Sequence, residues 1–172
     1  CELAGEEEDD RFGRIKVHRN KQDGGIVFSK ERLSCELSDC QKDLFQVRER
    51  MKMNQPALLR LIDYSAEEGK VENERAYIVT AYYDFPNGDL GYEIDQRRKK
   101  ENHFSSRELS SLLSDMCEAA SYLQKNKMVH GDIRPKYFSR FEKENKYKML
   151  DRLGTPAPAW QVQQTHFNSD AN

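Results

Sequence analysis

The chain has 172 residues, of which 37% are hydrophobic and 34% are charged, and its formal net charge is −2. A charge this close to zero excludes the strongly basic composition typical of proteins that bind nucleic acids or anionic membranes. No apolar run approaches the roughly 20 residues that a helix needs to cross a bilayer. We therefore expect a globular protein of one domain or slightly more, with no nucleic-acid or membrane partner.

The N-terminal third predicts an unstructured start followed by a hairpin. Residues 1–10 carry six acidic side chains and little that could be buried, so we expect residues 1–11 to be a solvated, disordered terminus. Alternating apolar residues predict strands from Phe12 to Val17 and from Ile26 to Lys30. The intervening Asp23-Gly24 pair is typical of a hairpin turn, because glycine adopts positive φ at little cost.

A helix and two further strands are predicted next. Ser38 followed by Gln41 is a capping-box pattern, and apolar residues then recur at helical spacing until Pro56. Residues 58–64 and 76–83 are apolar runs of strand length, and the polar segment between them predicts that they form a hairpin.

A second capping box, Ser105-x-x-Glu108, opens a longer helix. We expect one face of this helix to lie in the core and to seat the loop that follows at Val129. The residues on that face are Leu109, Leu112, Leu113, Met116, Ala120 and Leu123. The basic run at residues 97–100 is interpreted as the solvated end of a preceding helix, where cations interact favourably with the helix dipole.

Two short motifs carry the chemistry, MVHGDIRPKYF at residues 128–138 and KMLDRLG at residues 148–154. Asp132 is followed two residues later by Arg134, and Asp151 comes at the end of a strand predicted over residues 147–150. Two carboxylates on neighbouring loops, with a cation between them, suit phosphoryl transfer. One orients a hydroxyl, the other holds a divalent metal, and the cation offsets charge on the moving phosphate.

These motifs resemble the H-R-D-L-x-x-x-N and D-F-G motifs of eukaryotic protein kinases. The resemblance implies an α+β, two-lobed fold whose N-lobe is an antiparallel sheet with one helix. It places the N-lobe at residues 12–83, the hinge at 84–90 and a partial helical C-lobe at 91–172. The chain is expected to be a piece of a longer protein, because the later helices of that lobe are not in the sequence.

The resemblance also implies roles for individual residues. Asp132 is the implied catalytic base, Arg134 the implied loop cation and Asp151 the implied ligand of a single magnesium ion. ATP is the implied cofactor. The residues that the resemblance places around it are Lys30 at the phosphates, Tyr82 at the adenine pocket, Asp84 and Phe85 at the base through their backbones, and Asp89 near the ribose.

Several positions depart from the family pattern. Tyr137 replaces the Asn that holds a second magnesium, and a phenol is a poor ligand for so hard a cation. Gly131 replaces the loop Arg, and Arg152-Leu153 replace the Phe and Gly of the metal loop. The helix position that normally carries a Glu is most nearly Gln46. No G-x-G-x-x-G precedes Lys30, so this loop lies before Cys1 or has been lost.

Two functions therefore stay open for the full-length protein. One is a Ser/Thr-type protein kinase that transfers the γ-phosphoryl of ATP to a protein substrate. The other is a pseudokinase, a nucleotide-binding or scaffolding module with a protein partner; an unrelated α+β interaction domain remains a third reading. The chain by itself is expected to be inactive. Four cysteines without metal-type spacing predict free thiols and a cytoplasmic location.

Overall fold

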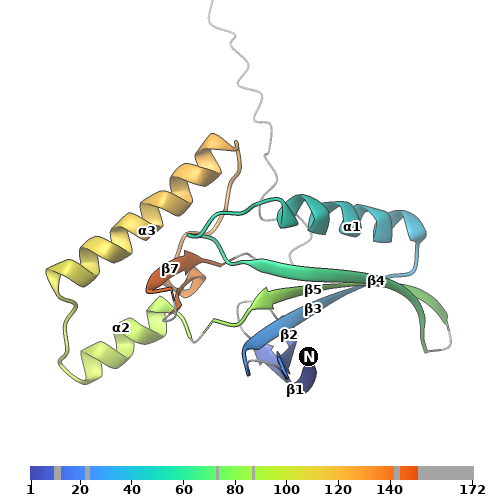
Figure 1. Cartoon of the computed structure of the whole chain (residues 1–172), viewed down its shortest axis with the longest axis horizontal. Helices are drawn as coiled ribbons and strands as arrows, with labels where there is room; N and C mark the ends of the chain where they lie inside the picture. The colour runs from blue at the N-terminus through green and yellow to red at the C-terminus, as the bar shows by residue number, and fades with distance from the viewer. Residues whose placement is uncertain (10–12, 22–23, 73, 87, 142–143, 151–172) are drawn as a thin grey trace, which may run out of the picture.

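The computed structural model describes residues 1–9, 13–21, 24–72, 74–86, 88–141 and 144–150. These residues form a kinase-like arrangement in two parts (Figure 1): a twisted antiparallel sheet covered on one side by a helix, and a second part with two helices and a small hairpin. None of the helices in the described ranges is long and apolar enough to span a membrane. All four cysteines are free thiols.

The main sheet has five strands within the described residues, in the order β1-β2-β3-β5-β4. Their bounds are Glu2–Asp9 for β1, Gly13–Arg19 for β2, Ile26–Ser34 for β3, Leu61–Val71 for β4 and Glu74–Asp84 for β5. The predicted β2–β3 hairpin is confirmed. Gly24 adopts a φ of +70°, and the Asn20 N–H donates to the Gly25 carbonyl at 2.8 Å.

The N-terminal segment corrects the expectation of a disordered terminus, because Glu2–Asp9 forms β1 and pairs with β2. Strand pairing uses backbone groups, so an acidic segment can join the sheet while its side chains stay in solvent. Glu6 accepts a hydrogen bond from Arg14 at 2.8 Å, and Glu2 lies 3.6 Å from Lys21. These cross-strand pairs offset part of the repulsion between neighbouring acids.

Helix α1 (Leu37–Met51) lies across one face of the sheet and contacts β3, β4 and β5 (Figure 1). Its sheet side includes the buried Cys40 and Val47. The predicted cap at Ser38 is wrong. The helix has already begun at Leu37, and the N-cap Glu36 makes no side-chain cap hydrogen bond.

The second part contains α2 (Leu90–Lys99), α3 (Ser106–Lys125), a 3₁₀ turn (Pro135–Tyr137) and the β6–β7 hairpin (Phe138–Phe141 and Lys146–Met149). Strand β7 connects this part to the segment that leads into β4. The Met149 N–H donates to the Ala57 carbonyl at 2.8 Å, and the Met149 carbonyl accepts from the Leu59 N–H at 2.8 Å.

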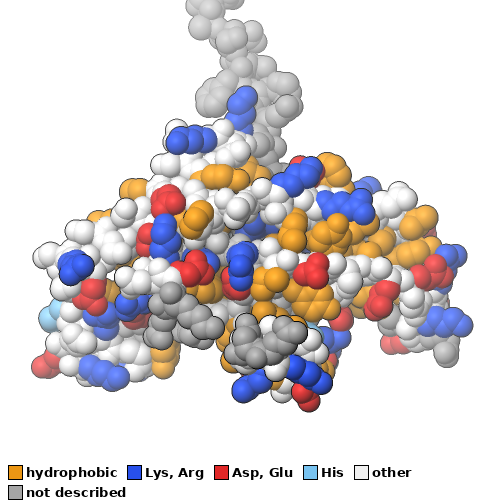
Figure 2. Space-filling model, viewed as in Figure 1, with side chains coloured by type: hydrophobic (Ala, Val, Ile, Leu, Met, Phe, Trp, Pro, Cys, Tyr) orange, Lys and Arg blue, Asp and Glu red, His pale blue; other side chains and the backbone are white. Residues whose placement is uncertain are grey.

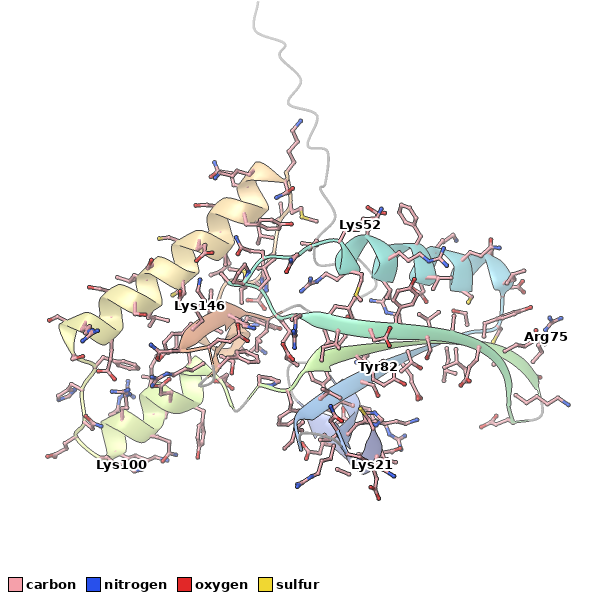
Figure 3. The ribbon with its side chains drawn as sticks, viewed as in Figure 1. Lys21, Lys52, Arg75, Tyr82, Lys100 and Lys146 are labelled. Carbon is pink, nitrogen blue, oxygen red and sulfur yellow. The ribbon has the colours of Figure 1, made fainter. Side chains whose placement is uncertain are left out.

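The predicted core face of α3 is only partly right. Leu112 and Leu123 are buried and Met116 is partly buried, but Leu109, Leu113 and Ala120 are exposed. Asp115 is buried instead, because its carboxylate accepts the Tyr147 N–H at 2.9 Å. Lys146, labelled in Figure 3, reaches towards the same helix and pairs with Glu118 at 2.6 Å.

The capping box of α3 is confirmed and predicts an acid-dependent loss of stability. Glu108 accepts from the Ser105 N–H at 2.7 Å and from Arg97 at 2.7 Å. Its pKa falls from 4.5 to about 2, chiefly through the Ser105 backbone and then Arg97. A folded-state pKa below the unfolded value adds stability above pH 4.5, and this contribution disappears as the pH falls towards 2.

We therefore expect Glu108→Gln to lower the melting temperature at pH 7. The melting temperatures of this variant and of the wild type should become equal near pH 2. Thermal unfolding followed by circular dichroism across this range measures the difference. Glu67→Gln, at an exposed position on β4, is the control, and its melting temperature should change with pH as that of the wild type does. A constant gap between Glu108→Gln and the wild type from pH 7 to pH 2 would contradict this account.

Candidate active site

The sheet face beneath α1 carries the central core of the protein. Alternation along β3 puts Phe28, Lys30 and Arg32 on the same face, and Arg32 reaches the α1 side chains Asp43 and Gln46 at 2.9 Å each. Tyr137 and Leu150, from the second part, belong to the same buried cluster as Phe28. Lys30 therefore lies on the face against which the second part packs.

Aromatic rings fill this face at the hinge end. Phe28 stacks on Tyr83 with ring centroids 5.3 Å apart, and Phe85 meets Phe28 edge-on at 6.3 Å. Phe28 and Leu150 have no exposed surface, and Tyr83 and Tyr137 are only 5% and 6% exposed. A planar base would have to displace at least one of these side chains to stack here.

The loop containing Asp132 is tied to β7 by a buried histidine. Nε2 of His130 lies 2.7 Å from the Leu150 carbonyl oxygen, and Nδ1 accepts the Asp132 N–H at 3.3 Å. Because the carbonyl can only accept, the ring carries its proton on Nε2. Asp132 is thus held close to the strand that leads to residue 151. Asp151 itself lies outside the described residues.

Asp132 and Arg134 are brought together as a bidentate pair. Nε of Arg134 donates to Oδ1 of Asp132 at 2.5 Å, and Nη2 donates to Oδ2. The hydrogen bond raises the pKa of Arg134. Both carboxylate oxygens of Asp132 are therefore engaged, so a substrate hydroxyl would have to compete with the guanidinium for them.

The two hinge acids make structural bonds. Asp84 accepts from Nε and Nη2 of Arg60 at 2.9 and 3.0 Å, and its carboxylate lies 3.9 Å from the buried Lys148 ammonium. Asp89 is the N-cap of α2 and accepts the Tyr92 N–H at 2.8 Å. The Asp89 carboxylate would have to give up this contact to bind a ribose, and the Asp84 backbone N–H, assigned to the base, donates to the Arg60 carbonyl at 3.2 Å.

Two comparisons identify the fold. The model of the protein tyrosine and serine/threonine kinase family matches residues 12–137. The chain belongs to the protein kinase family. It is also 29% identical over 128 residues to the probable serine/threonine-protein kinase nek3 of Dictyostelium discoideum. That match covers 72% of this chain but only 10% of the relative, so the chain spans about a tenth of that protein.

The family match ends at Tyr137, where a kinase has its second metal-binding Asn. Here the phenol is buried, and its ring meets His130 edge-on at 5.2 Å. The side chain is thus part of the core rather than of a metal site. Among the described residues no group of three or more His, Cys, Asp or Glu side chains could hold a metal ion.

Two side chains with kinase roles assigned from the sequence, Tyr82 and Gln46, make other contacts in the structure. Tyr82 pairs with Ser29 in the strand register, so it lies on the sheet face opposite Lys30. Figure 3 shows its side chain on the β2 side of β5, where its ring centroid is 5.6 Å from that of His18. Gln46 accepts its hydrogen bond from Arg32, a contact that the sequence motifs did not indicate.

Proposed function

We propose that this kinase domain is a pseudokinase, a protein-binding module that does not transfer phosphate at the rate of a kinase. The observation that carries the proposal is the closed sheet face beside Lys30. Phe28 and Leu150, both without exposed surface, occupy it together with the nearly buried Tyr83 and Tyr137. An ATP site needs a concave apolar slot at this place, largely formed before the ligand arrives.

The segment upstream of Lys30 supports the same conclusion. Five acidic residues follow one another at positions 6–10, and Gly13 is the next glycine after them. Kinases cover the ATP phosphates with a glycine-rich loop, whose backbone approaches the ligand closely. A run of carboxylates repels a triphosphate, because like charges at short range raise its free energy.

The residues present do not fit magnesium and ATP as the resemblance implies. Tyr137 replaces a hard oxygen ligand and is buried, and Asp132 is paired with Arg134 through both oxygens. Losing a single transition-state donor costs roughly 10²–10³-fold in rate. Two such losses together would lower the rate by roughly 10⁴–10⁶-fold.

ATP-dependent transfer to protein Ser or Thr remains the second candidate, and one contact favours it. His130 holds the Asp132 loop against the Leu150 carbonyl at 2.7 Å. A kinase needs this loop and the metal loop side by side, and the contact holds the Asp132 loop against the residue that precedes Asp151.

A phosphotransfer assay on the full-length protein tests the proposal. With radiolabelled ATP, magnesium and a mixed Ser/Thr peptide library, we expect equal background incorporation from the wild type and from Asp132→Asn. Asp95→Asn, an exposed acid on α2, serves as the matched control. If Asp132→Asn lowered incorporation at least a hundredfold while Asp95→Asn did not, the protein would be a kinase.

A further inference from the structure

An open hollow of about 1140 Å³ lies at the hinge end of the sheet, and its lining includes His18, Asp63 and Tyr82 on the face away from Lys30. Its volume is slightly above the roughly 300–1,000 Å³ of typical small-ligand sites. Its apolar lining comes from β1, β3, β4, β5, the residue after β5 and the β6–β7 hairpin, and it includes Leu3, Ile26, Val27, Ile62, Tyr64, Tyr82, Phe85 and Phe141. In Figure 2, hydrophobic side chains are visible between charged ones over the sheet.

Two polar groups in the lining have unused hydrogen-bonding capacity. His18 and Tyr82 face each other with ring centroids 5.6 Å apart. Nε2 of His18 lies 2.7 Å from the Ser29 hydroxyl. Within the described ranges, Nδ1 of His18 and the Tyr82 hydroxyl make no hydrogen bond. A neutral imidazole has one donor and one acceptor nitrogen, so this edge of the hollow offers a hydroxyl and a ring nitrogen side by side.

The charges around the hollow favour a neutral occupant. Arg60 and Asp84 neutralise each other in a bidentate pair, and Glu144 pairs with Lys148 at 2.6 Å. Asp63 also lines the hollow, and its carboxylate accepts only the Tyr64 N–H among the described contacts. Burial lowers the pKa of His18, with Lys16 adding to the effect, so its imidazole is uncharged at pH 7. A ligand anion would find no unpaired cation among these side chains and would meet Asp63.

We propose that this hollow binds a neutral, planar aromatic ligand that carries both a hydrogen-bond donor and an acceptor. The ring packs on Tyr82 and the neighbouring apolar lining, and its polar edge bonds to the Tyr82 hydroxyl and to Nδ1 of His18. Aromatic side chains, together with one hydrogen-bond donor and one acceptor, can recognise such a ligand although it carries no phosphate. The polar edge of this site, His18 and Tyr82, lies on the sheet face opposite Lys30.

Isoquinolinone, a neutral fused lactam with one N–H and one carbonyl, is a suitable probe, and naphthoate is its anionic counterpart. We expect isoquinolinone to bind the protein with a Kd of about 1 mM, as is usual for a ligand of this size. Its protons should show intermolecular NOEs to the Val27 and Ile62 methyl groups and none to those of Val17 and Leu150 in the core. Naphthoate should bind at least about tenfold more weakly.

Tyr82→Phe keeps the ring and removes the hydroxyl, so the variant should fold normally and bind isoquinolinone about fivefold more weakly. Tyr92→Phe removes an exposed hydroxyl on α2 and should leave the Kd unchanged. The proposal is overturned if no NOE is seen near saturation, if NOEs go to Val17 or Leu150, if Tyr82→Phe binds like the wild type, or if naphthoate binds equally well.

Discussion

Replacing Phe28 by Ala is expected to lower the free energy of unfolding by about 3–5 kcal/mol, the usual cost of removing a fully buried aromatic ring. Phe28 has no exposed surface and stacks on Tyr83 with centroids 5.3 Å apart. Its removal leaves a cavity that the surrounding strands can close only in part. Urea unfolding at pH 7, with the m-value checked for constancy, measures the loss.

Phe45→Ala is the matched control for this experiment. Phe45 lies on α1 and is 60% exposed, so its removal should change the free energy of unfolding by less than about 1 kcal/mol. If Phe28→Ala cost as little as Phe45→Ala, the sheet face beside Lys30 would be open rather than packed. An ATP molecule could then enter beside Lys30 without displacing a packed side chain.

Removing both carboxylates around Lys148 should be as damaging as removing Phe28. The Lys148 side chain is 3% exposed and pairs with Glu144 at 2.6 Å and with Asp84 at 3.9 Å. Its ammonium also lies 4.6 Å from the centre of the Phe141 ring. Without either acid, a buried charge is left uncompensated, and we expect Asp84→Ala/Glu144→Ala to cost about 3–5 kcal/mol.

Adding Lys148→Met to that double variant should recover most of the lost stability, because the buried charge is then gone. Urea unfolding of the double and triple variants makes the comparison. The stability that the exposed Arg60–Asp84 ion pair contributes, at most about 1 kcal/mol, should not be recovered, because the triple variant still lacks Asp84. A triple variant no more stable than the double one would show that Lys148 is not the source of the cost.

Local signals in the sequence predicted a good part of the fold. Asp23-Gly24 predicted the β2–β3 hairpin, because its turn chemistry is contained within a few residues. Ser105 and Glu108 predicted the start of α3 for the same reason. Strand β1 was missed because its acidic composition says nothing about backbone pairing, which depends on a partner elsewhere in the chain. Asp115 was missed as a core residue because its burial depends on the distant Tyr147 N–H.

The candidate site was harder to predict, because short motifs do not determine which face a side chain occupies. The spacing of the hinge placed Tyr82 beside the nucleotide, yet alternation along β5 puts it on the face opposite Lys30. A shift of one residue in a strand reverses every side chain. Tyr137 could be recognised as a substitution, but its burial against His130 follows only from three-dimensional packing.

Thermal unfolding of the full-length protein with and without millimolar Mg·ATP is the most direct test of the closed face. We predict an unchanged melting temperature. A nucleotide present at about ten times its Kd would stabilise the folded state by about 1.4 kcal/mol, which raises the melting temperature by several degrees. Such a rise, abolished by Lys30→Ala, would show that ATP binds beside Lys30 and would contradict the account.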